Sequence, residues 1–144
     1  MPYNRFHAGI AMNPHPAKRD KGGEDAATIT ESFIALADGV GGWAESGVDP
    51  AKYSRALCKN IQGLIMYDSE KFMCNPRQLC VEAAKLTKDM GSSTCVIASI
   101  DKEAPVLYTS NLGDSGYMLL RKTEEGVTIL FRSKEQTHGF NFPF

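Results

Sequence analysis

The chain has 144 residues, with 16 Lys plus Arg against 17 Asp plus Glu and a hydrophobic content of 42%. This length and composition are ordinary for one globular domain. Nothing in a formal charge of −1 suggests a polyanion-binding surface, so we expect no nucleic-acid partner. No apolar run is long enough to cross a bilayer and the N-terminus lacks a signal-peptide core, so we also expect no membrane span.

Cysteine and histidine give no metal-site spacing. The four cysteines form no CxxC pair and no zinc-type pattern with histidine, so we predict structural thiols in a reducing, intracellular compartment. His7, His15 and His138 match no ligand spacing either, and we expect them on the surface. Trp43, the one tryptophan, is predicted to pack beneath a loop.

The N-terminal third predicts an extended segment followed by a hairpin. Residues 1–20 carry Pro2, Pro14 and Pro16 without periodicity and form an extended lead-in to a domain over 21–144. From Ala26, the β-prone runs ATIT and SFIALA are joined at 31–32 and predict two antiparallel strands. A glycine-rich loop, DGVGGWAESG, follows the second strand.

Two helices are predicted next. Asp49-Pro50 and Asn75-Pro76 are both start signals, with a capping side chain followed by proline in the first helical position. Helical spacing relates the apolar residues of each segment. These are Tyr53, Leu57, Ile61, Leu64 and Ile65 in the first helix, and Leu79, Ala83, Leu86 and Met90 in the second, which is expected to stop at Gly91.

The last third changes to β-prone runs. TCVIASI, PVLYTSNL, GYMLLR and GVTILFR predict an antiparallel meander. The fold class is therefore α+β, with two helices packed on antiparallel sheet. Phe140, Phe142 and Phe144 end the chain, and we expect a partner chain or a missing C-terminal half of the domain to cover them.

The glycine loop allows two readings. Residues 39–44, GVGGWA, fit the dinucleotide fingerprint G-x-G-x-x-G/A after a strand. That fingerprint needs a parallel βαβ unit, whereas here one helix follows another, and Asp38 would repel a pyrophosphate. A hard cation fits better, because Mg²⁺ and Mn²⁺ prefer oxygen ligands. Asp38 offers a carboxylate at a strand end, and Gly39 leaves its carbonyl open to approach.

Further carboxylates have similar settings. Glu24-Asp25 precedes the first strand, and Asp114 lies in the break LGDSG between two later strands. If the first two strands pair as a hairpin, Glu24-Asp25 and Asp38-Gly39 lie at the same end of the sheet. Each aspartate alone could be a turn residue. Together they predict a metal site at one sheet edge.

The motifs KGGEDA, ALADGVGGWAESGVDP, GSSTCVIASI and NLGDSGYMLLR resemble the metal-dependent PP2C-type protein phosphatases, and most closely the branch with mitochondrial members. The resemblance runs from about residue 18 to the C-terminus. It implies part of an α-β-β-α sandwich that hydrolyses phosphoserine and phosphothreonine in proteins with a water activated by two Mn²⁺ or Mg²⁺ ions. By similarity, Asp38 bridges the two ions and Gly39 ligates one through its carbonyl. Glu24 reaches an ion directly or through water, with Asp25 beside it, and Asp114 helps hold a weaker third ion.

The sequence departs from the family pattern in two ways. The family commonly has an arginine four residues before the glutamate, to hold the phosphate. Asp20 stands there in this chain, and Arg19 and Lys21 are the flanking candidates for that role. The family's later aspartate ligands are also missing, because the remaining acidic residues (Glu124, Glu125 and Glu135) match no motif.

Two hypotheses follow from this half-built site. In the first, the chain is the N-terminal portion of an active phosphatase that requires a missing C-terminal portion. In the second, it is a non-catalytic structural or interaction subunit derived from such a phosphatase.

Overall fold

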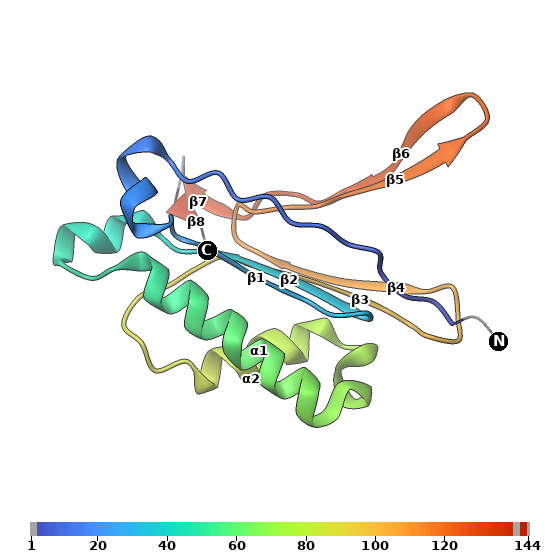
Figure 1. The fold of residues 1–144 in the computed structure, drawn as a ribbon, viewed down its shortest axis with the longest axis horizontal. Coiled ribbons are helices and arrows are strands. Elements are labelled where there is room, and N and C mark those ends of the chain that lie inside the picture. The colour runs from blue at the N-terminus through green and yellow to red at the C-terminus, as the bar shows by residue number, and fades with distance from the viewer. Residues whose placement is uncertain (1–2, 140–141, 144) are drawn as a thin grey trace.

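The structure, a computed structural model, describes residues 3–139 and 142–143. Its centre is a four-stranded antiparallel sheet in the order β1-β2-β3-β4, with two helices against one face (Figure 1). The sheet and helices comprise β1 (Asp25–Ile29), β2 (Phe33–Asp38), α1 (Pro50–Met73), α2 (Pro76–Leu86), β3 (Cys95–Ile100) and β4 (Leu107–Leu112). The predicted α+β class, with helices packed on antiparallel sheet, is confirmed.

The predicted hairpin forms from β1 and β2. Its turn is closed by Thr30, whose N–H donates to the Phe33 carbonyl at 2.8 Å and whose hydroxyl oxygen accepts from the Phe33 N–H at 2.9 Å. Along β2, Phe33, Ala35 and Ala37 are buried against the helices, and the intervening side chains point to the opposite face. The strand therefore ends with Asp38 on the face that the helices leave open.

Both helix starts are confirmed. The Asp49 side chain accepts the Ala51 N–H at 3.0 Å, and the Asn75 side chain accepts the Gln78 N–H at 3.1 Å. In each helix a proline follows the cap, as these signals predict.

The predicted end of the second helix at Gly91 is wrong. The helix stops at Leu86, because Thr87 has extended backbone and its hydroxyl donates to the Ala83 carbonyl at 2.9 Å. Leu86 and Met90, assigned to its buried stripe, are 53% and 66% exposed.

The core lies between the helices and the sheet. Its fully buried members come from every element of the main sheet and helices except β1 and β4, and include Phe33, Ile61, Phe72, Leu79, Cys95 and Ile97. Cys58 and Cys80 are buried in the same cluster, which agrees with the prediction of structural thiols, whereas Cys74 is exposed. This packing fixes α1 beneath the β1–β2 hairpin.

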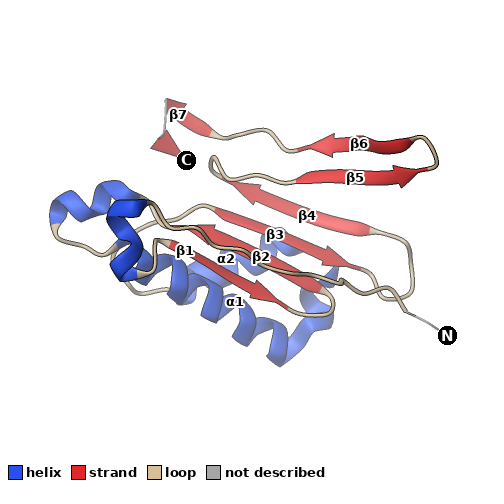
Figure 2. Ribbon diagram, turned by 45° about the horizontal axis from the view of Figure 1, so that its top comes forward, coloured by secondary structure: helices blue, strands red, loops and turns tan. Residues whose placement is uncertain are grey.

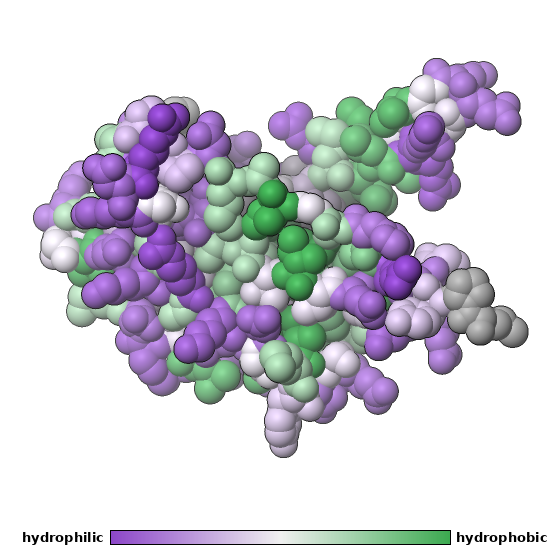
Figure 3. All heavy atoms as spheres, viewed as in Figure 1, coloured by the Kyte–Doolittle hydropathy of each residue, from purple (hydrophilic) through white to green (hydrophobic). Residues whose placement is uncertain are grey.

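The predicted four-strand meander is wrong after β4. Strands β5 (Met118–Thr123) and β6 (Gly126–Arg132) form a separate two-stranded ribbon that projects from the main sheet (Figure 1). Apolar side chains line this ribbon, as the space-filling view shows (Figure 3). Those at least 37% exposed are Met118, Leu119, Leu120, Val127, Ile129, Leu130 and Phe131.

The C-terminal residues form a short pair, β7 (Thr137–Gly139) and β8 (Phe142–Pro143). Phe140, Phe144 and the side chain of Phe142 lie outside the described residues, and with them the expectation that another segment covers these rings.

The extended N-terminal segment crosses the sheet face opposite the helices (Figure 2). It is tied there by the N–H groups of Asn4 and Phe6, which donate to the carbonyls of Lys102 and Glu31 at 2.9 and 2.7 Å. A short 3₁₀ helix, η1 (Pro16–Lys21), then leads into β1. Among the described residues, no helix has the length and apolar character needed to cross a membrane.

Candidate active site

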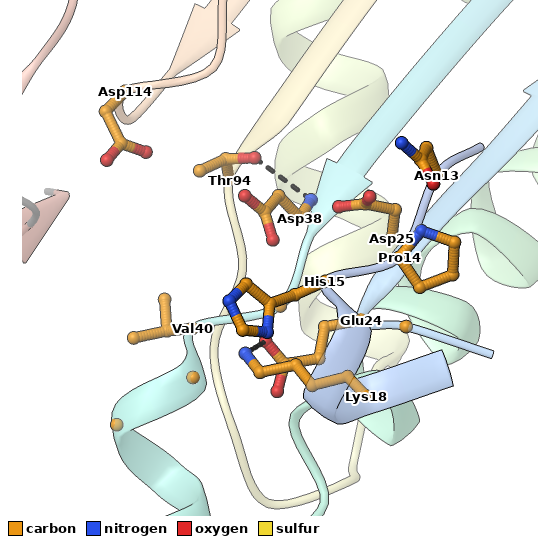
Figure 4. Close-up of a pocket in the computed structure, with 14 residues that line it drawn as sticks. Asn13, Pro14, His15, Lys18, Glu24, Asp25, Asp38, Val40, Thr94 and Asp114 are labelled. Atoms are coloured by element: carbon orange, nitrogen blue, oxygen red, sulfur yellow. Dashed lines mark hydrogen bonds and ion pairs between the residues drawn. The ribbon is translucent and has the colours of Figure 1, made fainter. Parts of the chain in front are cut away.

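Carboxylates from three segments meet in a pocket of about 390 Å³ at one end of the main sheet. Glu24 and Asp25 come from the start of β1, Asp38 from the end of β2, and Asp114 from the loop after β4 (Figure 4). The convergence follows from the hairpin, in which Asp25 and Asp38 are directly opposed partners. Directly opposed residues project to the same face of a sheet. The structure thus brings together all four carboxylates that the sequence singles out.

Backbone hydrogen bonds hold Glu24 against both β2 and α1. Its carbonyl accepts the Gly39 N–H at 3.0 Å and the Ser54 hydroxyl at 2.6 Å. Ser54 is fully buried on α1, so this contact ties the acidic segment to the buried face of that helix. The position of Glu24 is therefore set by the packed helix beneath it.

Gly39 is required by close packing. A β-carbon at this position would lie 2.4 Å from the Pro50 carbonyl oxygen and 3.1 Å from the Glu24 carbonyl oxygen. Only a residue without a side chain lets the first turn of α1 approach the end of β2 this closely. A substitution at Gly39 consequently disturbs strand–helix packing, whatever its own carbonyl binds.

Thr94 is a positioning residue whose role is not predicted from the sequence. It is 2% exposed, its hydroxyl oxygen accepts the Asp38 N–H at 3.0 Å, and its own N–H donates to the Asp38 carbonyl at 2.9 Å. The same hydroxyl lies 2.6 Å from the hydroxyl of Ser115, which follows Asp114. One buried side chain thus links the segments that carry Asp38 and Asp114. The available signal was the GSST run before β3.

The cation that faces the pocket is Lys18. Arg19 and Lys21, the predicted phosphate-binding residues, are exposed and do not line this pocket. Lys18 does line it, and its ammonium group forms an ion pair with the Glu24 carboxylate (Figure 4). His15 also lines the pocket while remaining exposed, and its Nδ1 accepts the Ala17 N–H at the start of η1.

Burial and the neighbouring carboxylates together raise the pKa of Asp38 to about 6. Partial burial is the largest cause, followed by the charge and the hydrogen-bonding contact of Asp25 and then by the charges of Asp114 and Glu24. This pocket carries more negative charge than its own cation neutralises, and a bound divalent cation would offset that excess.

We therefore expect the metal-free protein to lose stability as the pH rises from about 4 to 7. The folded pKa of Asp38 lies above its unfolded value, so the stabilising contribution is complete below pH 3.8 and is lost as pH rises through about 6. The carboxyl opens onto solvent, and screening limits the effect to about 1 kcal/mol. Thermal melts in EDTA, run against Asp38→Asn as the non-titrating control, check this. Parallel pH profiles of the two proteins would contradict it.

The donor set suits a hard divalent cation as a partial shell. Within the part of the chain that the structure describes, no group of three or more His, Cys, Asp or Glu side chains could hold a metal ion by itself. Mg²⁺ usually keeps several waters and takes only one or two carboxylates, with substrate phosphate completing its shell. The carboxylates of this pocket lie close enough to help raise the pKa of Asp38. They can therefore supply the one or two ligands that Mg²⁺ takes from a protein.

Comparisons with known proteins point to one family. No protein-family model matches the chain. The chain is 43% identical over 139 residues to "Probable protein phosphatase 2C 55" of Arabidopsis thaliana, covering 95% of the chain and 28% of that protein. It is 37% identical over 142 residues to "Protein phosphatase PTC7 homolog fig" of Drosophila ananassae, covering 92% of the chain and 41% of that protein.

The fold has a close match among solved structures. The X-ray structure of the photosystem II phosphatase PBCP matches with a TM-score of 0.81 and 32% sequence identity, over 92% of this chain and 51% of that one. The chain spans between 28% and 44% of the length of these curated relatives. Sequence and fold agree over nearly all of these residues, and the chain belongs to the PP2C-type family of protein phosphatases.

Proposed function

We propose that the protein hydrolyses phosphoserine and phosphothreonine in phosphoproteins with the help of two Mn²⁺ or Mg²⁺ ions, and of a weaker third. The observation that carries this proposal is the convergence of Glu24, Asp25, Asp38 and Asp114 in one pocket. Family membership supports the reaction class, and the raised pKa of Asp38 supports a cation among these carboxylates.

Each residue has a role in this proposal. Asp38 would hold both ions, since it lies between Asp25 and Asp114 in the carboxylate cluster. Glu24 and the Gly39 carbonyl would add the protein's other ligands for these ions, and Asp114 would help hold the weaker ion. Bound ions supply Lewis acidity, which activates a water and offsets charge on the phosphoryl oxygens. The chain's own residues would hold the ions and orient the phosphoryl group, so this role depends most on the rigidity of the β1–β2 hairpin.

We further propose that ligands from outside these 144 residues complete the site. The absence of a self-sufficient metal group among the described side chains supports this, as does the greater length of the relatives. The exposed apolar β5–β6 ribbon would be covered by the same additional portion. On this basis the 144-residue chain alone binds Mn²⁺ weakly.

The test is phosphate release from phosphoserine and phosphothreonine peptides by the intact protein, meaning these 144 residues together with the additional portion proposed above. We expect release with Mn²⁺ or Mg²⁺, loss of release in EDTA, and recovery when Mn²⁺ is added back in excess. A phosphotyrosine peptide of the same sequence serves as the substrate control. Absence of turnover by the folded intact protein at all Mn²⁺ concentrations would favour the alternative, a non-catalytic interaction subunit.

A further inference from the structure

The Lys18–Glu24 pair has an unusual place in the carboxylate pocket. The Glu24 side chain is only 15% exposed, whereas that of Lys18 is 43% exposed. Of the described residues that line the pocket, Lys18 is the one lysine or arginine. A carboxylate with so little access to water needs a counter-ion. In the metal-free protein that counter-ion is the Lys18 ammonium group.

The backbone directs Lys18 back onto a residue six positions ahead of it. Gly22 and Gly23 both have φ of +77°, a left-handed conformation that turns the chain sharply between η1 and β1. Lys18 is held at the other end of this turn, because its N–H donates to the His15 carbonyl at 2.8 Å and its carbonyl accepts the Gly23 N–H at 3.1 Å. The turn therefore delivers the ammonium group to Glu24. Arg19 and Lys21 are exposed and lie outside the carboxylate pocket, and Lys21 lines a neighbouring pocket.

The pair also has room to separate. Lys18 and Glu24 line the carboxylate pocket and, on their other side, a neighbouring pocket of about 290 Å³ beside the start of α1. Gly41 leaves space beside them, since a β-carbon there would lie 3.2 Å from Lys18 Nζ and 3.3 Å from Glu24 Oε2. The flexible lysine stem can swing between the two pockets while η1 stays in place.

We propose that Lys18 is an exchangeable counter-ion of Glu24. Entry of a divalent cation releases the ammonium group from the Glu24 carboxylate, and the freed group then binds a phosphoryl oxygen in the same pocket. The inference rests on the proposed function, and it gives Lys18 the phosphate-holding role for which no arginine stands in the family's position. Metal loading and phosphate affinity are thereby coupled through one side chain.

The test is Lys18→Met in the intact protein, with Mn²⁺ and then inorganic phosphate as calorimetric probes. Without its competitor, Mn²⁺ should bind about fivefold more tightly, the equivalent of one weak ion pair. Phosphate should bind the Mn²⁺-loaded variant at least about threefold more weakly, because one charged hydrogen bond is gone. Lys18→Gln is the second neutral variant, and Lys52→Met on the exposed surface of α1 is the matched control.

The sign of each change decides the question. A Lys18 that merely supports the orientation of Glu24 would lower Mn²⁺ affinity when removed, and that result overturns the exchange. Unchanged Mn²⁺ or phosphate affinity overturns it equally, as does a phosphate loss found at Arg19→Met or Lys21→Met instead. If Lys18→Met binds Mn²⁺ more tightly and phosphate more weakly in a protein with no phosphatase activity, the proposed function fails and the Lys18 exchange stands.

Discussion

Asp38→Asn is expected to lower Mn²⁺-dependent phosphate release by at least about 100-fold, because even outer-shell partners of metal ligands are worth 10- to 100-fold. Asp38 sits at the centre of the carboxylate cluster, and Asp25, Asp114 and Glu24 all act on its charge. Asparagine keeps the shape of the side chain and removes the negative charge that two cations would share. The loss should therefore appear in metal affinity and turnover together.

The same substitution should leave the fold intact. The Asp38 side chain faces the pocket, while its backbone N–H and carbonyl make the structural contacts to Thr94. Removing a carboxylate with a raised pKa should even stabilise the metal-free protein at neutral pH. Circular dichroism and melting in EDTA check the fold, and phosphate release at saturating Mn²⁺ measures the loss. Near-parental turnover would show that the chemistry does not depend on this carboxylate.

Gly39→Ala is expected to destabilise the protein by about 3 kcal/mol, the upper end of the usual cost of overpacking. The new β-carbon would lie 2.4 Å from the Pro50 carbonyl oxygen and 2.8 Å from its carbonyl carbon. Both belong to backbone, so neither can move aside as a flexible side chain would. Either α1 shifts away from the sheet, or the end of β2 shifts away from α1. In both cases the Gly39 N–H moves relative to the Glu24 carbonyl.

Gly42→Ala is the matched control for this prediction. Gly42 lies three residues away in the same loop, has no atom within 4 Å of a built β-carbon, and has no positive φ. Its substitution should change stability by no more than about 0.5 kcal/mol. In thermal melts, the alanine at position 39 should lower the melting temperature by about 10 °C and the control should hardly move it. Equal melting temperatures would mean that the β2–α1 contact tolerates a side chain.

The sequence predicted well those parts of the fold that depend on local signals. The caps at Asp49 and Asn75 and the hairpin of β1 and β2 each depend on a few neighbouring residues, and the structure confirms them. The predicted end of α2 was wrong because the Thr87 hydroxyl donates to the Ala83 carbonyl, a contact that the pattern of apolar residues does not reveal. The separate β5–β6 ribbon was also missed, since four successive β-prone runs look alike whether or not their strands share one sheet.

The candidate site was predictable where hairpin register controls it. Pairing β1 with β2 places Asp25 opposite Asp38, and that follows from sequence once the hairpin is drawn. The roles of Lys18 and Thr94 could not be found in this way. Lys18 reaches Glu24 through two left-handed glycines, and Thr94 reaches Asp38 from 56 residues away in sequence. Both contacts depend on tertiary geometry rather than on spacing.

Calorimetric titration of the intact protein and of Asp38→Asn with Mn²⁺ tests the central claim most directly, because it measures the cation site without relying on any substrate. The account predicts saturable Mn²⁺ binding by the parent protein and loss of most of that affinity in the variant, with matching circular dichroism spectra. Equal Mn²⁺ binding by the two proteins, or no binding by a folded parent protein, would contradict the claim that the carboxylates of this pocket hold divalent cations.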